Sequence, residues 1–118
     1  MGFELQVNEV DSYLSIKAVG DYTLADLSSL LDRAAKEAEK RGYRPVLLDI
    51  YEVTGSVPIF DMFELGEHCA RVWNRRVRIA IFTGEGGLNR FFENVARNRG
   101  VAVAIVPNQD AALAWLRI

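Results

Sequence analysis

The sequence contains only one histidine and one cysteine, His68 and Cys69, among its 118 residues. A single cysteine cannot form an internal disulfide, which argues against a disulfide-built secreted scaffold. Structural zinc sites favour four Cys or His ligands, and catalytic ones usually have three protein ligands. This chain cannot supply such a set without a second subunit. We therefore predict no metal, no cofactor and no enzymatic activity.

Nucleophilic catalysis is also disfavoured, because His68 and Cys69 are neighbours on a predicted helix and project about 100° apart. We expect Cys69 to pack in the core and His68 to lie at its rim. On the helix surface we expect Glu64 to pair with His68 and Glu67 with Arg71.

One catalytic alternative stays open. Asp21 or Asp49 could act together with Tyr22.

Long hydrophobic runs are missing too. The purest apolar run, 101–106, has six residues, far short of the roughly 20 that span a bilayer. The N-terminus lacks a basic region followed by an apolar stretch, so it does not resemble a signal peptide. We expect a cytoplasmic protein.

The balance of charge gives no general attraction to nucleic acid, since 14 basic and 16 acidic residues leave a net charge of −2. The halves of the chain differ, however. Residues 1–59 carry 6 Lys or Arg and 10 Asp or Glu, whereas residues 60–118 carry 8 and 6. The arginines of the second half cluster at predicted helix ends, where we expect a protein-partner or lipid-headgroup surface: Arg71, Arg75, Arg76, Arg97 and Arg99.

Apolar periodicity predicts an alternation of strands and helices. Strands are expected at 3–7, 14–18, 45–50, 77–82 and 101–106, and helices at 24–41, 59–73, 88–98 and 109–117. This order predicts one α/β domain over residues 1–118, with four helices on a mixed, mostly parallel sheet of about five strands. The first two strands are expected to form a hairpin across a polar turn at 8–12. Thr23 and Asp26 resemble a capping box, and Gly42 a helix stop.

The same periodicity predicts which helix residues are buried. In the second helix these are Ile59, Met62, Phe63, Gly66, Cys69, Ala70 and Trp73. In the third they are Leu88, Phe91, Phe92, Val95 and Ala96. We also consider a homodimer, because one small core has little room for Phe60, Phe92 and Trp115 together.

The loop 83–89, TGEGGLN, follows a predicted strand and opens a helix, which is a favourable context for anion binding. Gly84 and Gly86 begin a dinucleotide fingerprint, but Asn89 stands at its third small position and Glu85 would repel a phosphate. We therefore interpret the glycines as permitting a tight turn.

Several segments together resemble a known family. They are 47–50 (LLDI), 60–66 (FDMFELG), 78–82 (RIAIF), 110–116 (DAALAWL) and, most specifically, 91–100 (FFENVARNRG). Over nearly its whole length the chain resembles the SpoIIAA-like branch of the STAS domains. The resemblance implies a small mixed sheet with helices packed against it.

Anti-sigma-factor antagonists of that family are switches in which a serine of an Asp-Ser-Ser-Gly motif is phosphorylated. The motif would fall near Val57 and Pro58, where it is absent, and this departure argues against the sigma-factor role. Thr54 and Ser56 are the nearby hydroxyl candidates for phosphorylation. Related domains of this branch look like small-ligand or lipid-binding proteins, and their fold is similar to that of lipid-carrying Sec14-type domains.

A ligand crevice is expected where the strand order of an open α/β sheet reverses. If the second crossover returns along the sheet, the strands that end at Gly20 and Thr83 become neighbours. The candidate crevice residues are then Asp21, Tyr22, Thr23, Phe60, Phe63, Thr83 and Gly84.

Three functions follow as hypotheses. The preferred one is a non-catalytic, regulatory STAS-like module that binds a protein partner or a small apolar ligand. The second is a carrier of a lipid or hydrophobic metabolite that docks on membranes through its arginines. The third is a phospho-switch in an anti-sigma-factor-type cascade.

Overall fold

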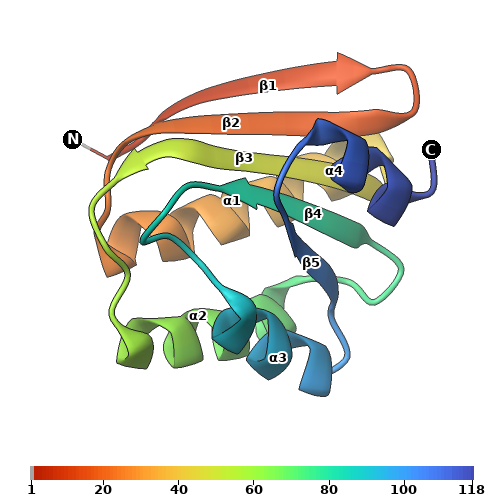
Figure 1. Cartoon of the computed structure of the whole chain (residues 1–118). Helices are drawn as coiled ribbons and strands as arrows, with labels where there is room; N and C mark the ends of the chain where they lie inside the picture. The colour runs from red at the N-terminus through yellow and green to blue at the C-terminus, as the bar shows by residue number, and fades with distance from the viewer. Residues whose placement is uncertain (1) are drawn as a thin grey trace.

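The computed structural model describes residues 2–118, which form five strands and four helices (Figure 1). The strands are β1 (Glu4–Val10), β2 (Tyr13–Asp21), β3 (Pro45–Thr54), β4 (Arg78–Thr83) and β5 (Ala102–Val106). The helices are α1 (Leu24–Arg41), α2 (Ile59–Val72), α3 (Arg90–Asn98) and α4 (Gln109–Leu116). The predicted α/β fold is confirmed. The first helix has the predicted bounds, whereas β2 and β3 extend further than predicted.

All five strands form one sheet in the order β1-β2-β3-β4-β5. β1 and β2 form the predicted antiparallel hairpin, but its turn is only the two residues Asp11 and Ser12. The other neighbouring strands are parallel. Because each crossover advances by one strand, right-handed connections place α1, α2 and α3 on the same face of the sheet. α4 packs on the opposite face, against β3, β4 and β5.

The predicted reversal of strand order is wrong. β3 lies between β2 and β4 and pairs with both, so the strands that end near Gly20 and Thr83 are not neighbours. Buried apolar runs identify segments as strands, but they do not tell in which direction each crossover leaves its strand. The sheet therefore has no switch point at which the predicted crevice could form.

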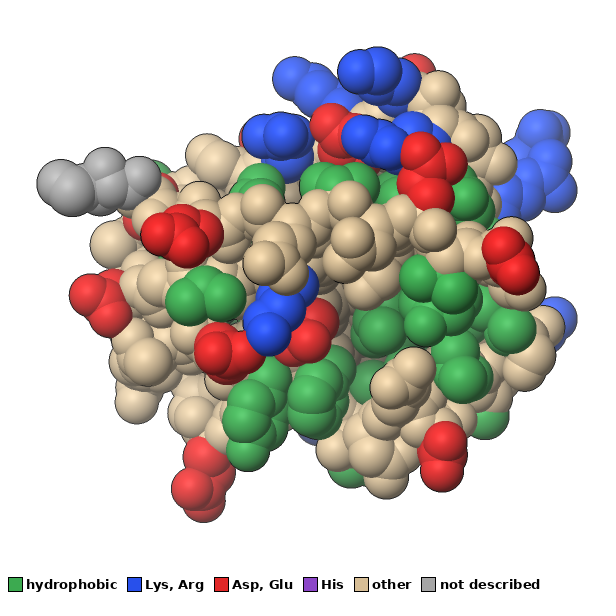
Figure 2. Space-filling view, turned by 90° about the horizontal axis from the view of Figure 1, so that it is seen from above, with side chains coloured by type: hydrophobic (Ala, Val, Ile, Leu, Met, Phe, Trp, Pro, Cys, Tyr) green, Lys and Arg blue, Asp and Glu red, His purple; other side chains and the backbone are tan. Residues whose placement is uncertain are grey.

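Two apolar cores hold the layers together. The larger lies between the sheet and α1–α3 and includes Leu14, Ile16, Leu48 and Ile81, all fully buried. The smaller lies under α4, where strand residues meet Ala112 and Leu116. α4 leaves part of this face open, and hydrophobic side chains reach the surface in Figure 2. Tyr51 is 56% exposed and stacks on Phe82, with ring centroids 4.9 Å apart.

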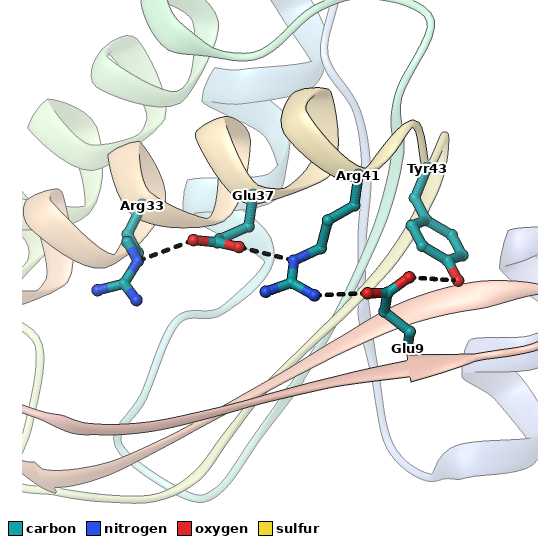
Figure 3. A network of polar contacts seen from close by, with 5 residues as sticks. All are labelled: Glu9, Arg33, Glu37, Arg41 and Tyr43. Atoms are coloured by element: carbon teal, nitrogen blue, oxygen red, sulfur yellow. Dashed lines mark hydrogen bonds and ion pairs between the residues drawn. The ribbon is translucent and has the colours of Figure 1, made fainter.

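The first helix is fixed at both ends and along its side. The Thr23 hydroxyl accepts a hydrogen bond from the Asp26 N–H at 3.0 Å, as predicted, and Gly42 ends the helix with a φ of 75°. Glu37 pairs with Arg41 at 2.7 Å, and Arg41 also pairs with Glu9 of β1 at 2.5 Å (Figure 3). This network joins α1 to the hairpin.

The second and third helices approach closely at Gly66. A Cβ at this position would lie 2.6 Å from Val95 Cγ1 and 2.8 Å from Val95 Cβ. Only the absence of a side chain allows this approach, because interiors are packed too tightly to absorb such an overlap. Gly66 thereby fixes how α2 is seated against α3.

The outer edge of β5 is covered by two side chains from α3. The Ile105 N–H donates to Glu93 Oε2 at 2.7 Å, and Arg97 Nε donates to the Val103 carbonyl at 2.7 Å. β5 is the last strand of the sheet, so these backbone groups have no neighbouring strand to bond. Glu93 and Arg97 thus replace a sixth strand and block pairing of this edge with another chain.

We expect Gly66→Ala to destabilise the protein. Alanine is intrinsically better than glycine in a helix by about 0.5–1 kcal/mol, but overpacking of this kind costs about 1–3 kcal/mol. Denaturant unfolding should show a net loss, whereas Glu64→Ala on the exposed side of α2 should stay within about 0.5 kcal/mol. A Gly66→Ala variant as stable as the natural protein would contradict the close contact.

Removing the acceptor that covers β5 should also destabilise the protein. Glu93→Met leaves the Ile105 N–H unpaired and should lower the free energy of unfolding by about 1–3 kcal/mol. Glu93→Gln should cost less, because its amide oxygen can still accept. Asn94→Met, at the exposed neighbouring position, is the matched control. Equal stabilities of the two methionine variants would refute the role of Glu93.

Candidate functional site

Three loops meet at the carboxyl end of the parallel strands. The Tyr22 N–H donates to the Thr54 carbonyl at 2.8 Å, and the Val57 N–H donates to the Gly86 carbonyl at 2.9 Å. These bonds link the loop after β2 to the end of β3, and the loop after β3 to the loop after β4. Loops at this end of an open α/β sheet are where ligands generally bind.

A pocket of about 620 Å³ opens among the last two of these loops and α3. Its lining combines Ser56, Val57 and Met62 with residues 83–90, Glu93 and Ile105. Two predicted crevice residues, Thr83 and Gly84, therefore line a pocket together with Ser56. Phe60, Phe63 and the residues after β2 do not belong to this lining.

The lining mixes polar groups with apolar side chains such as Val57, Met62 and Leu88. Glu85, Arg90 and Glu93 add charge to the hydroxyl groups of Ser56 and Thr83. The first-turn amide of α3 is also engaged, because the Phe91 N–H donates to the Asn89 side chain at 2.9 Å. With two carboxylates in the lining and a capped helix, the predicted interpretation of the glycines as turn residues fits better than phosphate binding.

The residues after β2 hold the fold together. Tyr22 donates its hydroxyl hydrogen to Asp61 Oδ2 at 2.8 Å, which ties this loop to the first turn of α2. Burial, together with the bond to Asp61, raises the pKa of Tyr22 well above its usual range. The Asp21 carboxylate accepts from the Thr54 hydroxyl at 2.5 Å. Asp49 is also engaged, since it accepts from the Tyr51 N–H at 3.1 Å.

Both phosphorylation candidates lie close to this end of the sheet. The Thr54 hydroxyl is engaged by Asp21, whereas Ser56 is exposed and lies beside the loop after β4. A Cβ on Gly86, whose φ is 82°, would lie 3.3 Å from Ser56 Oγ. Phosphorylation of either residue stays a prediction.

The first turns of α2 present large apolar side chains to solvent. Ile59 is 60% exposed, Phe60 85% and Phe63 41%. We call these three residues the α2 patch. The prediction that Ile59 and Phe63 are buried is wrong, because the buried stripe of α2 runs through Met62, Leu65, Gly66 and Cys69. Both residues lie at the margin of that stripe.

A similar difference affects α3. Phe91 is 40% exposed, contrary to prediction, while Phe92 is fully buried. The core thus accommodates Phe92. Trp115, in the last turn of α4, is half-buried against the smaller core. Of Phe60, Phe92 and Trp115, only Phe60 is largely exposed, so these three side chains do not by themselves require a homodimer. The oligomeric state itself stays a prediction.

Cys69 lies in the core and His68 at its rim, as predicted, but the partner of His68 differs from the predicted one. Cys69 is fully buried, and burial raises its pKa to about 12, which disfavours a reactive thiolate. His68 Nε2 lies 2.8 Å from Asp32 Oδ1 of α1, not beside Glu64. The contact crosses between helices, a partnership that spacing within one helix cannot reveal.

The predicted arginine surface separates into different environments. Arg99 pairs with Glu67 at 3.5 Å, in place of the predicted Arg71. Its guanidinium carbon also lies 5.4 Å from the centre of the Phe63 ring. Arg71 lies 3.5 Å from His68 Nδ1. Arg75 contacts Gly100, and Arg76 borders a second pocket between the ends of α1 and α2.

Arg97 instead joins residues that the sequence did not single out. Its guanidinium and that of Arg78 both lie over the ring of Trp115. The three residues come from β4, α3 and α4, so no local spacing in the sequence indicates this cluster.

No helix in residues 2–118 is both long enough and apolar enough to cross a membrane.

Sequence comparison gives no relative: no family model matches the chain, and no curated protein does. Solved structures do match. An anti-sigma factor antagonist from Mycobacterium paratuberculosis superposes with a TM-score of 0.67 at 11% identity, over 99% of this chain and 96% of that one.

An uncharacterised DUF3478-family protein with a SpoIIAA-like fold, from Shewanella loihica, matches with a TM-score of 0.53 at 26% identity. The match covers 98% of this chain and 93% of that one. The chain therefore has the SpoIIAA-like fold, the STAS fold of anti-sigma factor antagonists.

Proposed function

We propose that the protein is a non-catalytic regulatory module that binds another protein through the α2 patch. The observation that carries the proposal is the 85% exposure of Phe60, flanked on the same helix by the exposed Ile59 and Phe63. Large aromatic side chains of this kind commonly anchor protein interfaces, where they fill pockets on the partner. The structurally similar protein from Mycobacterium paratuberculosis is named an anti-sigma factor antagonist, and that name describes an action on another protein.

The charges around the α2 patch indicate the chemistry of the partner. Asp61, already bonded to Tyr22, and Glu64 lie within the same two turns of α2, and Arg99 beside Phe63 is paired with Glu67. The fitting partner surface is an apolar groove with lysine or arginine at its rim. Charge of that sign would complement Glu64 and increase the rate of association.

The other proposed roles have less support. A lipid carrier needs a predominantly apolar cavity, whereas the loop pocket places the charged Glu85, Arg90 and Glu93 among its apolar lining residues. A phospho-switch would act through Ser56, three residues before α2 begins. A phosphate there would bring about −1.5 to −2 charges close to the α2 patch and so would change partner binding rather than create it.

Replacing the central residue should weaken binding without affecting folding. A photo-crosslinking phenylalanine analogue at position 60 identifies the partner, which is then purified and titrated by calorimetry. Phe60→Ser should raise Kd by about thirtyfold or more, because hot-spot residues contribute 2 kcal/mol or more. Its free energy of unfolding should change by no more than about 0.5 kcal/mol, as for most exposed positions.

Tyr51→Ser, which removes an exposed aromatic from the opposite face of the sheet, is the control and should leave Kd unchanged. If Phe60→Ser binds the partner as tightly as the natural protein, the α2 patch is not the interface. If light scattering shows that the captured partner is a second copy of the chain, the proposed hetero-partner is wrong.

A further inference from the structure

Two arginines lie against Trp115, where β4 begins and α4 ends, and a third follows two residues after it. The guanidinium carbon of Arg78 lies 3.8 Å from the centre of the Trp115 ring, and that of Arg97 lies 4.6 Å from it. The ring is itself fixed, because its Nε1–H donates to the Ile79 carbonyl at 2.8 Å. Arg117 follows at the end of α4.

Backbone carbonyls hold two of these arginines in place through a single nitrogen each. Arg78 Nε donates to the Trp115 carbonyl, and Arg97 Nε donates to the Val103 carbonyl at 2.7 Å. An arginine has five N–H donors in a rigid plane. The terminal nitrogens of both guanidinium groups therefore remain to bind a ligand, while their Nε hydrogen bonds and the indole restrict how far the two side chains can move.

The positive charge of this cluster is not neutralised within residues 2–118. Arg41 and Arg99 form ion pairs, whereas no carboxylate of the described chain pairs with Arg78, Arg97 or Arg117. Burial lowers the pKa of Arg78, and the nearby charges of Arg117 and Arg97 lower it further. A bound anion would offset this accumulation of positive charge at Arg78.

Helix-end electrostatics explain only part of the arrangement. Cations are favourable at a helix C-terminus, and Arg78 does satisfy a carbonyl at the end of α4. Arg97 likewise covers the edge of β5. Each of these contacts uses Nε alone, and neither requires two guanidinium groups against one tryptophan ring.

We propose that Arg78, Arg97 and Arg117 form a binding site for a phosphate monoester beside Trp115. Guanidinium forks match the geometry of phosphate oxygens and bind them through paired charge-assisted hydrogen bonds. A dianion suits the three cations better than a single carboxylate does. The phosphate belongs either to a small soluble molecule or to a phosphatidic acid headgroup, which present the same chemistry.

This site is independent of the α2 patch. Arg78 begins β4, whereas the α2 patch lies at the start of α2, which follows the carboxyl end of β3. Loss of one function by mutation should leave the other intact.

The two tryptophans provide the test. Phenyl phosphate is titrated into ¹⁵N-labelled protein at constant ionic strength, and the indole N–H signals are followed by NMR. The Trp115 signal should shift saturably. The Trp73 signal should not, because Trp73 is only 6% exposed and lies near the ends of α1 and α2. Sodium chloride at equal ionic strength should move neither signal.

Arg117→Gln and Arg78→Gln should each weaken the affinity for phenyl phosphate about tenfold or more, the effect of losing a charge-assisted hydrogen bond. Arg90→Gln, which removes the same charge at the other end of α3, should leave it unchanged. If Arg78→Gln unfolds, the exposed Arg117 variant still decides. No saturable Trp115 shift, or an equal affinity in the Arg117 and Arg90 variants, would overturn the proposal.

Vesicles distinguish the two sources of phosphate. Binding to vesicles that contain phosphatidic acid, but not to pure phosphatidylcholine, would support a headgroup, provided that Arg117→Gln weakens it. Binding of phenyl phosphate without vesicle binding would support a soluble monoester. Vesicle binding without a saturable phenyl phosphate site would show attraction to a charged surface and would refute the site.

Discussion

The contact between α2 and α3 at Gly66 is the constraint on which the α2 patch depends. With 2.6 Å from a hypothetical Cβ to Val95, the helices leave no room to roll against one another. Met62, Leu65 and Cys69 are thereby directed into the core. Phe60 then has to point to solvent, and its exposure is a consequence of helix packing rather than of loose structure. The two apolar faces of α2 thus have different roles, one in stability and one, we propose, in binding.

Polar side chains complete the sheet where packing alone cannot. Glu93 and Arg97 from α3 occupy the open edge of β5, and Tyr22 joins the loop after β2 to α2. Of these three residues, Tyr22 is the one that the catalytic alternative would use, and its hydroxyl is engaged by Asp61. Arg97 combines a structural contact with a place in the proposed phosphate site. Its Nε bonds to the edge of β5, while its guanidinium group lies over Trp115.

Local patterns predicted most of the fold. The cap at Thr23 and the stop at Gly42 depend on neighbouring residues, and both are present where the sequence places them. The direction of the second crossover was wrong because it depends on contacts between distant strands. The candidate crevice is divided accordingly: Thr83 and Gly84 line a pocket, whereas Asp21 and Tyr22 bond to other residues, and ligand binding by any of them stays a prediction.

The sequence also does not determine which face of α2 is buried. A period of three to four residues fits a stripe through Ile59 and Phe63 as well as one through Leu65 and Cys69, and only the neighbouring helix decides between them. The Trp115 cluster joins residues from β4, α3 and the end of α4, so spacing along the chain carries no sign of it.

Amide hydrogen exchange of the protein with and without its purified partner tests the central claim most directly. Docking on the α2 patch predicts slower exchange in the first two turns of α2, with no change in the loop that follows β4. Slower exchange confined to that loop, with α2 unaffected, would contradict the account and indicate that the partner binds at the loop pocket.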